Sequence, residues 1–270
     1  MTDRGLGYRK DLPSPDDVRL GVNRGSLILG AGDLPEADLH LVELVPTPKD
    51  QQIFESCVGM SLMNLGYVMQ AAEGYEPELP SPGFIWWNSL KSHSDEGLNV
   101  GTYFRNAIKT LPDLGMSPEK FCRIADMDQL LRKPDDPDYD GRPSHQAYQH
   151  AFDSKFEIDP IRLDADDGDE AKQQVQSCIV NNMPVAFGML VPKSFLSLGT
   201  HDVLPMFDAG AAKAGGHAMC VVGYDARGVI VINSWGQYWG NAGLCHLSWD
   251  FFTSGWVDDK WTIRRMPQIG

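Results

Sequence analysis

Apolar positions in the first half of the chain recur at helical spacing. Between Cys57 and about Ala72, apolar side chains return every three or four residues without a proline, which predicts a helix that begins at or just after Cys57. Ser56 stands where a capping residue is expected. Similar but shorter patterns predict further helices over about 102–111, about 171–181 and within 143–152.

After Pro184 the pattern changes to short β-branched and aromatic runs bounded by glycine and proline, which predict strands. The predicted strands are Val185–Leu190, His217–Tyr224, Val229–Ile232, Leu244–Trp249 and Trp261–Arg265. A mainly helical first half followed by a mainly β second half predicts an α+β protein of two lobes with a cleft between them.

The first 50 residues contain many turn formers and only short apolar runs, which predicts an extended arm over residues 1–45. The main domain is then expected over 46–270, with a helical lobe at about 46–135 and a β-rich lobe at about 155–265. The segment Lys133–Ser144, dense in proline, aspartate and glycine, is expected to connect the lobes.

The chain is strongly acidic, with 37 aspartates and glutamates against 23 lysines and arginines and a formal net charge of −14. Nucleic acid and anionic membrane surfaces are held by clustered basic residues, so neither is expected as a partner. The two acidic runs, Asp135–Asp140 and Asp164–Glu170, are interpreted as solvated loops and not as sites.

Only features that the sequence lacks bear on the compartment of the protein. No signal peptide is recognisable in the first residues, and no segment approaches the ~20 apolar residues that cross a bilayer. The five cysteines are few, odd in number and widely separated, unlike a disulfide framework. A cytoplasmic location is therefore expected in preference to export by a route without a signal peptide.

Cys57 is a candidate nucleophile because the free N–H groups and dipole of a helix start lower the pKa of a thiol. Beside an imidazole, the thiol becomes a thiolate ready near neutral pH, and the imidazolium is an acid for a leaving amine. His217 opens a predicted strand after Gly215-Gly216, where small residues let another chain approach. Asn233 ends the strand expected to pair with it, and its amide oxygen can accept the second imidazole N–H.

A tetrahedral intermediate also needs donors aimed at its oxyanion. A side-chain amide just before the nucleophile, together with the backbone N–H of the nucleophile, can supply them. Both Gln51 and Gln52 precede Cys57 on one loop, and chemistry alone does not choose between them.

Several short motifs occur in the order and spacing of papain-like cysteine peptidases. Gln51–Cys57 resembles their Gln-to-Cys segment, in which the oxyanion glutamine lies six residues before the nucleophile, and this selects Gln51. The histidine and asparagine motifs are matched by Gly215–Ala218, Val222–Tyr224, Asn233–Gly236 and Trp239–Gly243. Phe84–Asn88 and Asn99–Lys109 also resemble compact bacterial members of the family.

The resemblance covers about residues 45–265 and implies a papain-like catalytic domain of two lobes. It implies a cysteine-type peptidase that hydrolyses peptide or protein substrates through a thioester acyl-enzyme on Cys57. His217 would act as base and acid, and neither a metal nor an organic cofactor is implied. A β-barrel-like lobe carries His217 and Asn233, and the helical lobe carries Cys57.

The resemblance also implies substrate-binding positions. Trp235 is expected to cover the hydrogen bond between Asn233 and His217, and backbone near Gly101 is expected to pair with the substrate main chain, with Gly216 beside it. A peptide held in this way is recognised like an added strand.

Val58-Gly59 departs from the family, whose members usually have tryptophan, or a small residue then alanine, after the nucleophile. Phe54 replaces the disulfide cysteine that commonly lies three residues before it. Two alternatives stay open: an acyl or peptide transferase on the same fold, and a catalytically silent peptide-binding relative, against which the intact set of four residues argues. Residues near Gly21–Leu34 are expected to lie in or near the cleft and to restrain access.

Overall fold

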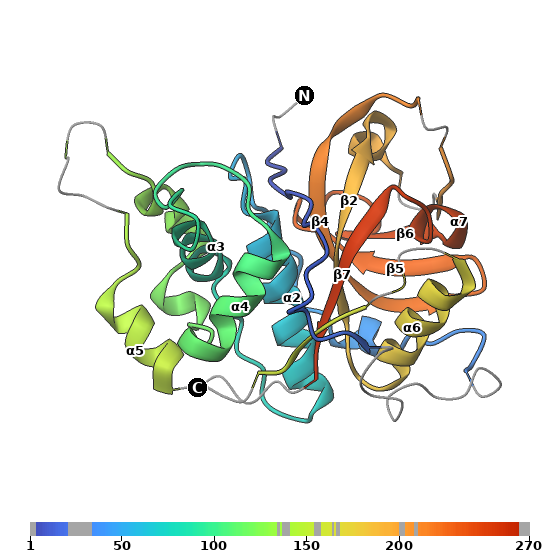
Figure 1. Cartoon of the computed structure of the whole chain (residues 1–270), viewed down its shortest axis with the longest axis horizontal. Helices are drawn as coiled ribbons and strands as arrows, with labels where there is room; N and C mark the ends of the chain where they lie inside the picture. The colour runs from blue at the N-terminus through green and yellow to red at the C-terminus, as the bar shows by residue number, and fades with distance from the viewer. Residues whose placement is uncertain are drawn as a thin grey trace.

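The computed structural model of the chain describes residues 4–20, 34–133, 136, 141–153, 158–163, 165, 168–199, 203–207 and 210–264. Helices gather in one lobe, on the left of Figure 1, and a sheet forms the other. The expected α+β fold of two lobes is confirmed. Most of the predicted Gly21–Leu34 segment and of the acidic run Asp135–Asp140 lies outside the described residues, as do half of Lys133–Ser144 and part of Asp164–Glu170. The last residues of Asp164–Glu170 begin a helix and are not the loop that was expected.

The helical lobe is built around α2, Cys57–Ala72, whose side chains are buried along almost its whole length. It packs against α3 on one side and against the sheet on the other, so it lies at the junction of the lobes. The remaining helical segments of this lobe are α3 (Pro82–Lys91), α4 (Phe104–Leu114), η2 (Glu119–Phe121), η3 (Ile124–Leu130) and α5 (His145–Asp153).

Close packing of α2 on α3 accounts for one departure from the family. A Cβ atom on Gly59 would lie 2.4 Å from the carbonyl oxygen of Pro82 and 3.3 Å from Cβ of Trp86. Glycine therefore lets the two helices touch through their main chains. Phe54, in place of a disulfide cysteine, packs edge-on against Trp86 with ring centroids 6.4 Å apart.

The β-rich lobe contains one sheet in the order β1-β7-β2-β4-β5-β6-β3. Neighbouring strands are antiparallel except β3 and β6, which are parallel. Helices α6 (Gly168–Val180) and α7 (Trp249–Phe252) and the short η4 (Lys193–Ser197) belong to this lobe, while η1 (His40–Leu44) precedes α2. The strands are β1 (Pro160–Arg162), β2 (Val185–Pro192), β3 (Val203–Leu204), β4 (Lys213–Asp225), β5 (Gly228–Ile232), β6 (Leu244–Ser248) and β7 (Val257–Ile263).

Two sequence expectations need correction. Ser56 occupies the cap position of α2, but its hydroxyl is buried and makes no hydrogen bond with the described residues. The last strand begins at Val257 and not at Trp261. It includes Asp258, Asp259 and Lys260, which are buried despite their charges. Charged residues inside a strand hide it from a search for apolar runs.

The N-terminal arm runs between the two lobes, where it appears as the dark blue segment in Figure 1. It forms a parallel bridge to the helical lobe, Tyr8 with Thr102, and a second to the β-rich lobe, Arg19 with Arg162. We use the name arm for residues 4–20 from here on. None of the helices in the described part of the chain combines the length and apolar character needed to cross a bilayer.

Candidate active site

Cys57 is the first residue of α2 and is fully buried. Its sulfur lies against the backbone amide of Ala218, and the amides of Val58 and Cys57 itself also point toward it. Ala218 follows His217 on β4. The packing of α2 against β4 therefore brings the thiol beside the strand that carries the predicted base.

His217 and Asn233 meet because β4 pairs with β5, the strand that ends just before Asn233. Nε2 of His217 lies 2.8 Å from Oδ1 of Asn233, which also accepts a hydrogen bond from the backbone of Ser234 at 2.7 Å. Since the amide oxygen accepts, Nε2 carries the hydrogen and Nδ1 is the basic nitrogen. Nδ1 is buried and has no hydrogen-bond partner among the described residues, so it is the nitrogen left to serve a thiol.

Trp235 lies over the imidazole. The two rings stack at 20° with centroids 4.6 Å apart, and Trp235 in turn meets Trp239 edge-on at 5.2 Å. This aromatic packing keeps His217 and Asn233 out of water, which strengthens the hydrogen bond between them.

Gln51, and not Gln52, presents its side chain to the cleft. Gln51 is fully buried, and its amide nitrogen donates to the carbonyl oxygens of Phe54 at 2.7 Å and of Leu6 at 3.2 Å. The hydroxyl of Ser234 donates to its Oε1 at 2.5 Å, which fixes the amide orientation. The side chain of Gln52 is exposed, and its backbone adopts a φ of 56°.

The arm covers the predicted oxyanion donor. The carbonyl oxygen of Leu6 accepts from Gln51, and the backbone N–H of Gly5 donates to the carbonyl oxygen of Gln52 at 2.7 Å. The guanidinium of Arg4 lies 5.0 Å from the centroid of the Trp235 ring. A segment of the chain itself thus occupies the position where the carbonyl of a reacting peptide is expected.

Farther along, the arm is held like a strand by both lobes. Thr102 donates its N–H to the carbonyl of Gly7 at 2.8 Å and accepts from Arg9 at 2.9 Å. On the other side, Tyr8 donates its N–H to the carbonyl of Gly216 at 3.2 Å. These bonds come from Thr102, one residue past the predicted Gly101, and from the predicted Gly216.

Glycines make this contact close. A Cβ on Gly5 would lie 2.0 Å from the carbonyl oxygen of Phe54, and one on Gly7 would lie 2.2 Å from that of Glu55. Gly101 faces the arm in the same way, since its Cβ would lie 2.2 Å from the carbonyl oxygen of Gly7. Main chain rests on main chain, which leaves no path for a second peptide.

Burial changes the protonation expected at the catalytic pair. Desolvation raises the pKa of the Cys57 thiol far above its ordinary range, although backbone amides at the helix start act in the opposite direction. Desolvation, together with a smaller effect from the charge of Arg4, also lowers the pKa of His217 to about 4, despite the favourable bond to Asn233. With the arm in place, both directions favour a neutral thiol and a neutral imidazole, in contrast to the expected thiolate–imidazolium pair.

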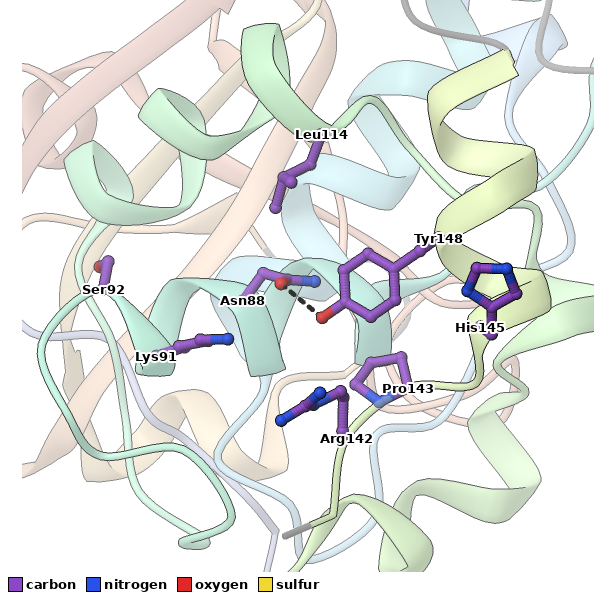
Figure 2. Close-up of a pocket in the computed structure, with 8 residues that line it drawn as sticks. All are labelled: Asn88, Lys91, Ser92, Leu114, Arg142, Pro143, His145 and Tyr148. Atoms are coloured by element: carbon purple, nitrogen blue, oxygen red, sulfur yellow. Dashed lines mark hydrogen bonds between the residues drawn. The ribbon is translucent and has the colours of Figure 1, made fainter.

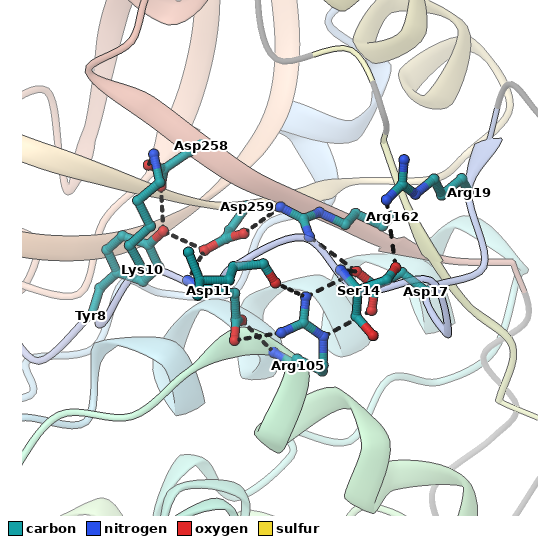
Figure 3. Close-up of polar contacts among 11 residues, drawn as sticks. Tyr8, Lys10, Asp11, Ser14, Asp17, Arg19, Arg105, Arg162, Asp258 and Asp259 are labelled. Carbon is teal, nitrogen blue, oxygen red and sulfur yellow. Dashed lines mark hydrogen bonds and ion pairs between the residues drawn. The ribbon is translucent and has the colours of Figure 1, made fainter.

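Sequence reasoning missed a buried polar cluster that fastens the arm, shown in Figure 3. We call it the latch, and it consists of Tyr8, Asp11, Asp17, Arg105, Arg162, Asp258 and Asp259. No motif marks these residues, because they come from four distant segments and carry meaning only once they are folded together.

Two arginines join the arm to both lobes. Arg105, near the start of α4, contacts Asp17 at 2.8 Å and Asp11 at 3.0 Å. Arg162 on β1 bridges Asp17 at 3.0 Å and Asp259 at 2.7 Å. Because these groups are largely removed from water, breaking one pair would leave an uncompensated charge.

A second hollow of about 600 Å³ lies on the helical lobe between α3 and α5 (Figure 2). The hydroxyl of Tyr148 donates to Oδ1 of Asn88 at 2.8 Å on its wall, and Lys91, Arg142 and His145 line it. None of the predicted site residues lines this hollow, so it is separate from the Cys57 site.

Comparison with known proteins points to one family. Residues 115–262 match the papain family of cysteine proteases, a span that contains His217 and Asn233 but begins after Cys57. An uncharacterized peptidase C1-like protein of Acanthamoeba polyphaga mimivirus is 24% identical over 286 aligned positions, covering 97% of this chain and 88% of the relative.

Solved structures show the same fold. Xylellain, a cysteine protease from Xylella fastidiosa, superposes with a TM-score of 0.81 at 25% identity and 98% coverage of both chains. Digestive procathepsin L 3 from the larval midgut of Tenebrio molitor gives a TM-score of 0.64 at 16% identity, covering 98% of this chain and 77% of its own. The chain belongs to the papain family of cysteine proteases.

Proposed function

We propose that this papain-family protease hydrolyses peptide bonds with Cys57 as nucleophile, His217 as base and acid, Asn233 as the orienting residue and Gln51 as an oxyanion donor. One observation carries the proposal: Cys57 lies against Ala218, the residue after His217, while the arm bonds to the Gln51 amide and to Gly216, the residue before His217. A substrate that replaced the arm would meet the same groups.

The chemistry follows from these positions. The proton of the Cys57 thiol passes to Nδ1 of His217, and the sulfur attacks the peptide carbonyl carbon. The oxyanion accepts hydrogen bonds from Gln51 Nε2 and the Cys57 N–H. The imidazolium then protonates the leaving amine as the C–N bond breaks, which leaves a thioester. Water, deprotonated by His217, attacks the thioester, releases the acid and regenerates the thiol.

We also propose that the arm keeps this enzyme latent. It fills the path of a substrate main chain through bonds to Gln51, Thr102 and Gly216. The positive charge of Arg4 in the arm also helps to lower the pKa of His217 and so to keep it neutral. Release of the arm would admit both substrate and water, and hydration favours the charged pair.

The experiment compares the full chain with a chain that lacks residues 1–35, each with and without Cys57→Ala. A peptide-library digest should show products that require Cys57, formed faster by the shortened chain, and a thiol-directed epoxide should modify Cys57 in the folded protein. A synthetic peptide of residues 4–20 should slow the shortened chain again.

Three results would count against the proposals. Modification of Cys57 only after unfolding, without Cys57-dependent products, would favour a catalytically silent peptide-binding relative. Equal or lower activity in a shortened chain with native circular dichroism would reject latency by the arm. Transfer of the acyl group to an added amine in place of water would favour the transferase.

A further inference from the structure

Tyr8 fills a pocket at the junction of the lobes, directly beside the proposed catalytic pair. Its main chain bonds to Gly216, the residue before His217, and its side chain is only 8% exposed. We define the Tyr8 pocket by the residues that surround this side chain, which are Phe104, Gly188, Gly216, Asp258 and Asp259. The ring of Phe104 lies against Tyr8 with centroids 5.9 Å apart.

Gly188 gives the pocket its depth. A Cβ on Gly188 would lie 2.1 Å from Cζ of Tyr8 and 2.3 Å from Cε2, so any other residue would occupy the space of the ring. Gly188 on β2 pairs with Ala218 on β4, next to His217. The floor of the pocket and the proposed base therefore belong to one rigid part of the sheet.

The far end of the pocket holds two adjacent carboxylates. The hydroxyl of Tyr8 donates to Oδ2 of Asp259 at 2.6 Å and also contacts Oδ1 of Asp258 (Figure 3). Adjacent residues of a regular strand point to opposite faces of the sheet, so in a regular strand only one of these two carboxylates would face Tyr8.

An irregularity in β7 turns both carboxylates toward Tyr8. Asp259 has a φ of 46°, and the register between β2 and β7 shifts between Ala186 and Gly188. Such a bulge re-aims side chains, and a left-handed backbone at a residue other than glycine is unfavourable and typical of functional sites. The strand departs from regular geometry at the one point where two acids meet in the pocket.

The arm supplies the partners of one of these acids. The side chain of Asp258 contacts Tyr8 and, at 2.5 Å, Lys10, and both residues belong to the arm. Asp259, in contrast, pairs at 2.7 Å with Arg162 of β1, which does not belong to the arm. The emptied pocket would thus end in a carboxylate that has lost both of these partners, and such a buried group is costly until a donor replaces them.

We propose that Asp258 makes the Tyr8 pocket selective for peptides that present arginine, lysine or tyrosine there. The inference rests on the proposed peptidase function. The stem of arginine or lysine can lie where the ring lies now, with its charge at Asp258. Aliphatic side chains would leave that carboxylate without a donor, and acidic ones would add a like charge.

The test uses the full chain and a positional library of fluorogenic tetrapeptides. We expect one library position at which arginine, lysine and tyrosine are hydrolysed at least ~10-fold faster than leucine. Asp258→Asn should then lower the arginine-to-leucine ratio of kcat/KM at that position by ~10–100-fold, the range for a hydrogen bond to a charged group. Asp250→Asn, at an exposed aspartate of α7, is the matched control and should leave the ratio unchanged.

The library profile tests the pocket assignment even if Asp258→Asn does not fold, because the profile is measured without that variant. Hydrolysis that requires Cys57 but prefers aliphatic side chains at every position would overturn the pocket assignment and leave the peptidase standing. An unchanged ratio in folded Asp258→Asn would also overturn it. Absence of any Cys57-dependent hydrolysis, both by the full chain and by the chain that lacks residues 1–35, would overturn the proposed function and this inference together.

Discussion

Asp259→Asn should remove a proton-linked contribution to closure of the arm. In the closed form, burial raises the pKa of Asp259 to about 6 from 3.8, although bonds from Tyr8 and Asp11 oppose the rise. When the arm leaves, water reaches the carboxylate and Arg162 stays beside it, so its pKa returns toward the ordinary value. The closed form therefore binds this proton more tightly, and Asp259 opposes closure increasingly as pH rises from about 4 to about 6.

The size of the effect follows from the shift. About two pKa units correspond to about 3 kcal/mol, or ~100-fold in the closed-to-open ratio. Other titratable groups also change the pH dependence of arm closure. Burial raises the pKa of Asp11, so Asp11, like Asp259, opposes closure as pH rises. Burial also raises the pKa of Asp17, but hydrogen bonds from Arg105 and Arg162 outweigh burial and bring this pKa to about 2. Asp17 therefore favours closure as pH rises. The lowered pKa of His217, about 4, likewise disfavours closure in acid.

The ratio of Cys57 modification rates between wild type and Asp259→Asn isolates the contribution of Asp259. We would measure the rate at which iodoacetamide modifies Cys57 in full-length wild type and in Asp259→Asn, by mass spectrometry of the Cys57 peptide, between about pH 4 and 7. Thiolate formation and the other linked groups are common to both proteins and cancel.

The wild-type rate should rise relative to that of the variant by ~100-fold across this range. The loss of the Arg162 pair shifts the variant by an amount that does not depend on pH. Asp250→Asn should give a flat ratio with wild type. A wild-type to Asp259→Asn ratio that stays flat, or falls as pH rises, would refute the reasoning.

Three further changes test other parts of the structure. Tyr8→Ala should cost the closed arm about 3–5 kcal/mol and raise peptide hydrolysis by the full chain up to ~10²–10³-fold, whereas Tyr238→Ala, at a side chain 96% exposed, should not; equal rates would contradict the role of Tyr8. Gln51→Ala should lower kcat by ~10²–10³-fold with little change in KM, and a loss confined to KM would reject the oxyanion role. In urea unfolding, Ser81→Ala should cost about 1 kcal/mol because Ser81 caps α3 through a 3.0 Å bond from Phe84, and Ser56→Ala should cost less than about 0.5 kcal/mol; the reverse order would contradict the cap assignment.

Regular patterns account for the parts of the fold that were predicted. Helix α2 and strands β4 and β5 were foreseen because each combines uniform apolar spacing with clear ends, and the short turn between β4 and β5 fixed their pairing. Helix α3 was not foreseen as a helix, because it is buried on every side and shows little alternation of apolar and polar positions.

The site divides in the same way. Local chemistry pointed to Cys57 and His217, and strand pairing to Asn233, whereas the choice of Gln51 over Gln52 came from family spacing. The latch and the Tyr8 pocket were invisible in sequence. Their carboxylates come together through a bulge at Asp259 and a contact across about the whole chain, and neither has a local signature.

That contact joins residues 251 positions apart, Tyr8 and Asp259, and so bears on the order of events during synthesis. The arm leaves the ribosome well before its partners on β7 are made. The arm must wait undocked while the rest of the chain is added at ~5–20 residues per second. The strand that supplies Asp258 and Asp259 also completes the sheet beside His217. Completion of a working cleft and its closure therefore depend on the same segment, β7, and the growing chain spends little time with an open, finished site.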